Sequence, residues 1–218
     1  MVLSRLSALQ HDLAAAMFSG PTTMVLTGGA ALAGFHLGHR TTKDLDLFGD
    51  RSVDLQAEES LLELAATQIG ATMEHLRSLP YLRQVAVRRG AEVTTVDLVR
   101  DTAPRVEPPR RIGGVLLDTM REIAANKLVA LLGRAEPRDL VDLRAMLGTG
   151  LDLDQALADA LTKDGGADVA TLAWLMSEWS IGSAVVLPGG VGADELERFR
   201  AGLERALRAR ALPWQPRG

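Results

Sequence analysis

The sequence has no cysteine, which excludes disulfide bonds and thiolate metal sites and suits a reducing compartment. It has no apolar run near the ~20 residues that a membrane-spanning helix needs. The first residues lack the layout of a signal peptide, because His11 and Asp12 interrupt their apolar pattern. An excess of positive charge is also absent, and the net charge of −4 argues against a wholly basic nucleic-acid binder. Together these absences favour a cytoplasmic protein.

What is present is an ordinary soluble composition, with 47% hydrophobic and 24% charged residues in a chain of 218. That length fits one large domain or two small ones and allows a substantial core. The positive charge is local. Four arginines surround one loop: Arg100, Arg105, Arg110 and Arg111. Six more lie in the C-terminal tail, where exposure to solvent explains them: Arg198, Arg200, Arg205, Arg208, Arg210 and Arg217.

The first half of the chain alternates between helical and strand patterns. A run of β-branched and apolar residues is typical of a buried strand, and polar–apolar alternation is typical of a half-buried one. These patterns predict helices over 4–18, 30–37 and 55–69, and strands over 22–28, 44–48, 71–77, 82–88 and 92–99.

The composition changes at residues 101–114, a stretch rich in proline and glycine that predicts a loop or domain connector. Beyond it almost everything has a helical pattern, opened by a capping-box signature at Thr119 and Glu122. The predicted helices are 119–134, 138–147, 152–163, 168–180 and 193–210. We therefore predict an α+β fold, with a mixed-sheet core over residues 1–114 and a helical bundle over 115–218.

The segment Asp44-Leu45-Asp46-Leu47 places two carboxylates on one face of a strand and two leucines on the other. Neighbouring carboxylates repel each other unless a cation neutralises them, and hard ions such as Mg²⁺ prefer oxygen ligands. A solvated strand edge explains the same pattern, and a D-x-D motif taken alone favours that simpler explanation.

Two further features change that balance. Gly28 and Gly29 end a buried strand where a helix begins, so backbone N–H groups there can face an anion with no side chain in the way. A tight strand-to-helix turn would explain one glycine more easily than two. Asp97 lies between apolar residues of a later strand and needs a partner, either water at a sheet edge or a cation shared with Asp44 and Asp46. The shared cation requires all three aspartates on one face of one sheet.

Gly28-Gly29, the helix after them, Asp44-x-Asp46 and Asp97 resemble the nucleotidyltransferase core of the DNA polymerase beta superfamily. The stretch LTGGAALAGFHLGHRTTKDLDLF is more similar still to the AbiEii/AbiGii-type nucleotidyltransferase toxins, which typically show a GG-T/S-A-L-A start and a G-H-R-x-S/T-x-D-h-D-L-F end. The resemblance implies that the glycines hold a triphosphate and that the three aspartates bind two Mg²⁺ ions for in-line transfer. This chain has Ala30 where a hydroxyl residue is usual, which removes one hydrogen bond to phosphate.

The stretch REIAANKLVALLGRAEPRDLVDL resembles a second segment of the same family. Lys127 and Arg134 share one helix face, where they could reach polyphosphate or be simply solvated. The resemblance makes them nucleotide or substrate contacts and makes Asp139 or Asp142, with Asp142 favoured, the group that orients or deprotonates the acceptor. A salt bridge between Arg138 and Asp142 is the structural alternative. Because other residues supply the core stripe, we expect Lys127→Ala to leave the fold intact while weakening nucleotide binding.

The remaining candidate binding residues have weaker support from the sequence. His36 and His39 have a metal-ligand spacing, but no third histidine or cysteine is near in sequence. We expect His39 and Arg40 to shape the loop before the D-x-D motif, with Arg40 a phosphate contact. Three tryptophans could stack a base or sugar, and the two in an apolar helix are expected in the core: Trp174 and Trp179 in the helix, Trp214 beyond it.

The resemblance implies an NTP- and Mg²⁺-dependent toxin that transfers a nucleotide to RNA, such as tRNA, and is restrained by a separately encoded antitoxin. A small-molecule adenylyltransferase of the aminoglycoside or lincosamide type has a similar glycine and D-x-D start, although the second segment favours the toxin family. A catalytically silent binding module of the same fold is a third alternative, and retention of all three aspartates counts against it.

The arginine-rich loop bears on the choice of acceptor. An RNA acceptor needs a positive approach to the site, because phosphate contacts supply much of its affinity. The loop directly follows the strand that carries Asp97, so we expect its arginines to border the active-site cleft and guide RNA to it: Arg100, Arg105, Arg110 and Arg111.

Overall fold

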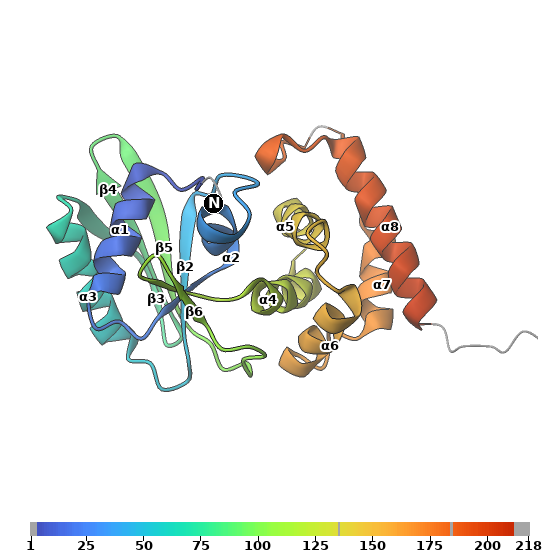
Figure 1. The fold of residues 1–218 in the computed structure, drawn as a ribbon, viewed down its shortest axis with the longest axis horizontal. Helices are drawn as coiled ribbons and strands as arrows, with labels where there is room; N and C mark the ends of the chain where they lie inside the picture. The colour runs from blue at the N-terminus through green and yellow to red at the C-terminus, as the bar shows by residue number, and fades with distance from the viewer. Residues whose placement is uncertain (1–3, 135, 184, 212–218) are drawn as a thin grey trace, which may run out of the picture. The chain divides into compact units, whose positions relative to one another are not determined.

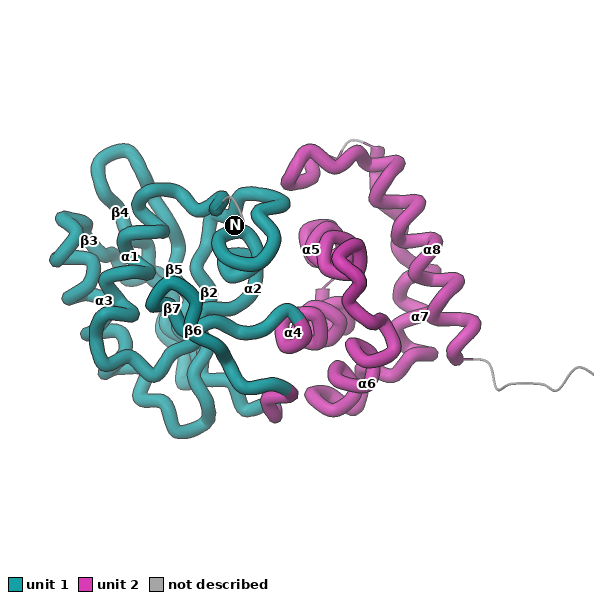
Figure 2. The backbone as a smooth tube through the Cα atoms, viewed as in Figure 1, with its two compact units in different colours: residues 1–103, 107–120 teal, residues 104–106, 121–218 magenta. Residues whose placement is uncertain are grey.

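The computed structural model describes residues 4–134, 136–183 and 185–211, so Trp214 lies outside the described residues. The chain divides into two compact units (Figure 2): unit 1 comprises residues 1–103 and 107–120, and unit 2 comprises residues 104–106 and 121–218. Unit 1 contains the sheet, unit 2 is helical, and the chain is α+β as predicted. No helix in the described part of the chain is long and apolar enough to cross a membrane.

Unit 1 is built on a seven-stranded mixed sheet with the strand order β3-β4-β5-β2-β1-β7-β6. The strands are β1 Val25–Thr27, β2 Asp44–Gly49, β3 Thr72–Leu79, β4 Leu82–Arg89, β5 Glu92–Arg100, β6 Arg110–Ile112 and β7 Val115–Leu117. The β2–β5 and β1–β7 pairs are parallel, and the other neighbouring pairs are antiparallel. The D-x-D strand β2 therefore lies at the centre of the sheet, between β5 and β1.

Alternation along the strands gives the sheet two unlike faces. The helices of unit 1 are α1 Ala8–Ser19, α2 Gly28–Ala31, the π-helical turn η1 Leu32–His36, and α3 Leu55–Gln68. α1 and α3 cover the apolar face (Figure 1), where Leu45 and Leu47 of β2 are 2% and 3% exposed. Burying each such side chain contributes about 1.5–3 kcal/mol. Gln10 of α1 also donates to the Thr94 hydroxyl of β5 on this face, over 3.1 Å.

The sheet continues past residue 114, where the sequence predicts the end of the first domain. Inside the proline-rich stretch, β6 forms a hairpin with β7, and β7 pairs in parallel with β1. β6 has three residues, all exposed, with prolines before it and glycines after it. A strand this short and this polar leaves no periodic signal, so composition alone indicated a connector.

Unit 2 consists of α4 Met120–Gly133, α5 Pro137–Leu147, α6 Leu153–Lys163, α7 Val169–Glu178 and α8 Ala193–Ala211, with a 3₁₀ turn, η2, at Pro188–Gly190. Glu122 of α4 and Lys163 of α6 form a buried ion pair of 2.6 Å. Glu122 also accepts the N–H of Val106, and Lys163 donates to the carbonyl of Pro104. These contacts explain why residues 104–106 group with unit 2 although two strands of unit 1 follow them.

Candidate active site

The pairing of β2 with β5 places the three predicted aspartates on one face of the sheet. Asp46 lies directly beside Asp97 in the parallel register, and Asp44 is two residues earlier on β2. Paired residues share a face, as do residues two apart along a strand. The carboxylates therefore project from the face opposite the one that α1 and α3 cover, and all three residues are half-buried there. The expectation that Asp97 shares a face with Asp44 and Asp46 is confirmed.

Two neutral side chains hold the outer carboxylates of this group. The hydroxyl of Thr42 donates to Asp44 Oδ1, and Gln84 Nε2 donates to Asp97 Oδ1 over 2.8 Å. Gln84 lies opposite Asp97 in the antiparallel β4–β5 pair, so strand register brings the two side chains together. Sequence reasoning missed both donors. Thr42 occupies the S/T position of the family motif, whereas nothing near Gln84 in the sequence marks it.

Gly28 packs against one of these carboxylates, and Gly29 packs against the loop before the D-x-D strand. Gly28 has a φ of 61°, which favours glycine, and a Cβ at this position would overlap the Asp46 carboxylate. A Cβ on Gly29 would lie 2.6 Å from Arg40 Nη2. Arg40 itself is 7% exposed and donates to the carbonyl of Thr41. Gly28 therefore lets the start of α2 approach the D-x-D strand, and Gly29 leaves room for the buried Arg40 side chain.

The donor set suits a hard divalent cation in its chemistry, because it offers several carboxylate oxygens from adjacent backbone positions. Across the residues that the structure describes, no three acidic or histidine side chains are already gathered around one point. A cation would therefore have to draw the carboxylates of Asp44, Asp46 and Asp97 together from the positions that the sheet gives them.

The predicted histidine pair has a structural explanation at its first member. His36 Nε2 lies 2.8 Å from the backbone carbonyl oxygen of Asp118, so this nitrogen carries the proton and donates it. Burial lowers the pKa of His36 below its ordinary value, and the hydrogen bond to Asp118 opposes that shift only in part. A neutral His36 thus ties η1 to the residue after β7.

Lys127 of α4 lies in a buried ion-pair cluster within unit 2. Its Nζ is 2.7 Å from Asp139 Oδ1 and 2.8 Å from Asp142 Oδ2, and both α5 carboxylates are fully buried. Arg134 Nε adds a contact of 3.1 Å to Asp139. Burial by itself lowers the pKa of Lys127, but the carboxylates of Asp142 and Asp139 outweigh it and raise the pKa above its ordinary value.

This cluster contradicts the expectation that Lys127 can be replaced at little cost to stability. Its side chain is 9% exposed and neutralises two carboxylates that have no exposed area. The helix pattern correctly places Lys127 and Arg134 on one face, since both reach Asp139. It cannot show that the facing helix supplies buried anions, because that depends on packing between α4 and α5.

Two of the arginines after the Asp97 strand, Arg110 and Arg111, do not lie beside the carboxylates. β6, which carries Arg110 and Arg111, lies four strand spacings of about 4.8 Å from β5, or roughly 19 Å. Arg110 pairs with Glu107 over 2.9 Å, and Arg111 donates to the carbonyl of Gly114. Arg105 belongs to unit 2. For Arg110 and Arg111 the expectation is wrong, because residues close in sequence are separated by the strand order.

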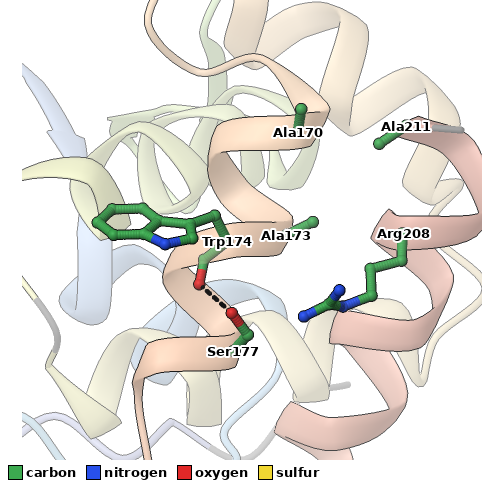
Figure 3. A pocket seen from close by; sticks show the side chains of 6 residues that line it. All are labelled: Ala170, Ala173, Trp174, Ser177, Arg208 and Ala211. Atoms are coloured by element: carbon green, nitrogen blue, oxygen red, sulfur yellow. Dashed lines mark hydrogen bonds between the residues drawn. The ribbon is translucent and has the colours of Figure 1, made fainter.

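A separate pocket lies between α7 and α8 of unit 2 (Figure 3). Its volume is about 230 Å³, and its lining consists of Ala170, Ala173, Trp174, Ser177, Arg208 and Ala211. Trp174 is 60% exposed, so the expectation that it lies in the core is wrong, while Trp179 is half-buried. In Figure 3 the Trp174 indole points away from Arg208, so the two side chains do not enclose a stacking site. No residue singled out by the motifs lines this pocket.

The Lys127 cluster generates a stability prediction. Lys127→Met should lower the free energy of unfolding by about 3–5 kcal/mol, because it leaves two buried carboxylates without their shared cation. Since the folded-state pKa is raised, this stabilisation is complete at neutral pH and is lost only as the pH rises through that pKa. Urea unfolding at pH 7 measures the difference.

The matched control is Lys43→Met, which replaces an exposed lysine and should change stability by no more than about 0.5 kcal/mol. Adding Asp142→Asn to Lys127→Met should recover part of the loss, because one of the stranded charges is then removed. Equal stability of Lys127→Met and the parent protein would show that the cluster contributes nothing.

Two solved structures share the fold of this chain. The crystal structure of JHP933 from Helicobacter pylori matches with 21% identity and a TM-score of 0.56, over 93% of this chain and 92% of that one. The crystal structure of a putative nucleotidyltransferase from H. pylori matches with 18% identity and a TM-score of 0.57, over 94% and 96%. Identities this low establish a shared fold only.

None of the curated proteins matches the chain. The family model described as "Nucleotidyl transferase AbiEii toxin, Type IV TA system" matches residues 11–215, which is nearly the whole chain. This match confirms the resemblance drawn from the glycine, D-x-D and lysine motifs. The chain belongs to the AbiEii nucleotidyl transferase toxin family of type IV toxin–antitoxin systems.

Proposed function

We propose that this chain is a nucleotidyltransferase that uses an NTP and Mg²⁺ to attach a nucleotide to an RNA acceptor. One observation carries the proposal: Asp46 and Asp97 lie side by side on the face of the sheet opposite α1 and α3, and the Gly28 turn packs directly against Asp46. Membership of the AbiEii family supports a nucleotide substrate and a cognate antitoxin.

In the proposed reaction Asp44, Asp46 and Asp97 hold the divalent ions. Bound Mg²⁺ would supply charge neutralisation for the triphosphate and favour in-line attack by an acceptor hydroxyl. The chain's own residues set the geometry, because Thr42 and Gln84 fix the carboxylates of Asp44 and Asp97. Gly28 and Gly29 are proposed to contribute backbone N–H groups to phosphate binding, with no side chains of their own in the way and with Arg40 beside Gly29.

The motif residues of unit 2 have a second set of proposed roles. Lys127 and Arg134 are proposed as nucleotide contacts, and Asp142 as the group that orients or deprotonates the acceptor. Each also belongs to the buried cluster around Asp139, so loss of activity in an alanine variant would not separate function from folding. Lys127→Arg keeps the cation and is the better probe of nucleotide use.

The identity of the acceptor rests on family membership rather than on the arginine loop, since Arg110 and Arg111 lie far from Asp97 in the strand order. A small-molecule acceptor of the aminoglycoside or lincosamide kind is therefore the competing substrate. A catalytically silent binding module of this fold is the competing class of function.

The function is tested by incubating the protein with Mg²⁺, total RNA and each α-labelled NTP in turn. We expect one NTP to label RNA, and we expect Asp46→Asn to abolish labelling, because removing one carboxylate charge weakens the hold on the cation. Glu63→Gln, an exposed change on α3, is the matched control and should label RNA at the parent rate.

The other outcomes separate the alternatives. Label on an added aminoglycoside or lincosamide, with none on RNA, would move the small-molecule function ahead. An absence of transfer to any acceptor, together with an absence of NTP binding, would favour a silent module.

Gln84 generates a further prediction. Gln84→Met retains the size of the side chain but cannot donate to Asp97, so we expect the Kd for Mn²⁺ to rise about 10–100-fold. The free energy of unfolding should change little, since Gln84 is only partly buried. Gln68→Met, at an exposed position at the end of α3, should leave the Mn²⁺ affinity unchanged. Parent-like Mn²⁺ affinity in Gln84→Met would mean that the hydrogen bond to Asp97 does not position a metal ligand.

A further inference from the structure

Thr27, the last residue of β1, carries a hydroxyl that the protein leaves unsatisfied. Thr27 is 2% exposed, and its Oγ1 has no hydrogen-bond partner among the residues that the structure describes. It stands at the N-cap of α2, yet its side chain makes no capping hydrogen bond. Burying a hydroxyl without a partner costs stability, and native proteins leave few such groups.

The position of Thr27 connects this hydroxyl to the carboxylates. Thr27 pairs with Asp46 in the antiparallel β1–β2 register, so its side chain projects from the same face of the sheet. The register continues through Asp97 to Gln84, and the four residues form one row across β1, β2, β5 and β4. Gly28, which packs on Asp46, is the next residue along the chain.

Stability alone gives no reason for threonine at this place. Val25 and Leu26, the other residues of β1, are buried and apolar, and valine has nearly the shape of threonine without the hydroxyl. A buried polar group that a protein leaves unpaired calls for a physical explanation, and a bound ligand is one that fits a residue beside Asp46. The proton of this hydroxyl needs an acceptor, and a ligand that brings one to the site would satisfy it.

We propose that the Thr27 hydroxyl donates a hydrogen bond to a phosphate oxygen of the bound nucleotide. This inference rests on the proposed nucleotidyl transfer and assigns one contact within it. A divalent cation cannot accept a hydrogen bond. A phosphate bound to such a cation has oxygens that can accept one from Thr27. Thr27 is therefore a substrate-binding residue, distinct from the aspartates that hold the metal.

The test compares four full-length proteins: the parent, Thr27→Val, Thr27→Ser and Thr94→Val. For each, the melting temperature is measured without ligand, and the Kd is measured for the Mg²⁺ complexes of the four NTPs and of inorganic tripolyphosphate. Thr94 is the matched control, because it is also a buried strand threonine but lies on the helix-covered face and bonds to Gln10 and the carbonyl of Lys43.

Thr27→Val should melt at the same temperature as the parent or higher, yet bind the NTP and tripolyphosphate about tenfold more weakly, as expected for one hydrogen bond to a charged group. Thr27→Ser, which retains the hydroxyl, should bind like the parent. Thr94→Val should show the opposite pair of effects, a lower melting temperature with parent-like binding.

Parent-like affinity of Thr27→Val would overturn the inference while leaving the proposed function intact. Weaker NTP binding with parent-like tripolyphosphate binding would overturn the assignment to phosphate. If the parent bound none of the NTPs, the proposed function would fail, and this contact with it.

Discussion

The parallel pairing of β2 with β5 is the constraint on which the rest of unit 1 depends, because it forces Asp46 and Asp97 side by side. Like charges directly opposite each other destabilise a sheet, and these two residues are half-buried. The neighbouring residues accommodate the pair. Gln84 holds Asp97 from β4, and Gly28 lets the backbone pass close to the Asp46 carboxylate. A sheet selected only for stability would not retain this arrangement.

In unit 2, cationic side chains contact the buried carboxylates. Asp139 and Asp142 are fully buried, but Lys127 contacts both carboxylates and Arg134 contacts one of them. A charge compensated in this manner specifies how α4 packs on α5, and removing either sign damages the fold. In unit 1 the hydroxyl of Thr42 and the amide of Gln84 are neutral donors, which orient a carboxylate without neutralising it. Neutral donors thus contact the carboxylates of unit 1, whereas a shared cation holds the buried carboxylates of unit 2.

Much of unit 1 could be predicted from the sequence, because it follows from local periodicity. Alternation in Asp44-Leu45-Asp46-Leu47 correctly separates carboxylates from core, and the apolar neighbours of Asp97 correctly place it in a strand. What the pattern cannot supply is strand order. Arg110 is 13 residues after Asp97 along the chain, yet three strands lie between their own two in the sheet.

The same limit explains the other errors and omissions. The helical spacing of Lys127 gives no sign that the fold depends on this residue, and only the packing of α5 reveals its two buried partners. Gln84 and Thr27 have no motif of their own, since their importance comes from the residues that register sets beside them. Whether a buried hydroxyl lacks a hydrogen-bond partner depends on all the residues around it, so it can be recognised only in the three-dimensional structure.

The central claim is that Asp44, Asp46 and Asp97 form a divalent-metal site for a nucleotide. Anomalous diffraction from crystals grown with Mn²⁺ and a non-hydrolysable NTP analogue tests it most directly. The account predicts a manganese peak within coordination distance of Asp46 and Asp97, about 2.1–2.2 Å from their carboxylate oxygens, as for small hard cations. Clear density for the analogue with its manganese held elsewhere, or manganese at other carboxylates only, would contradict it.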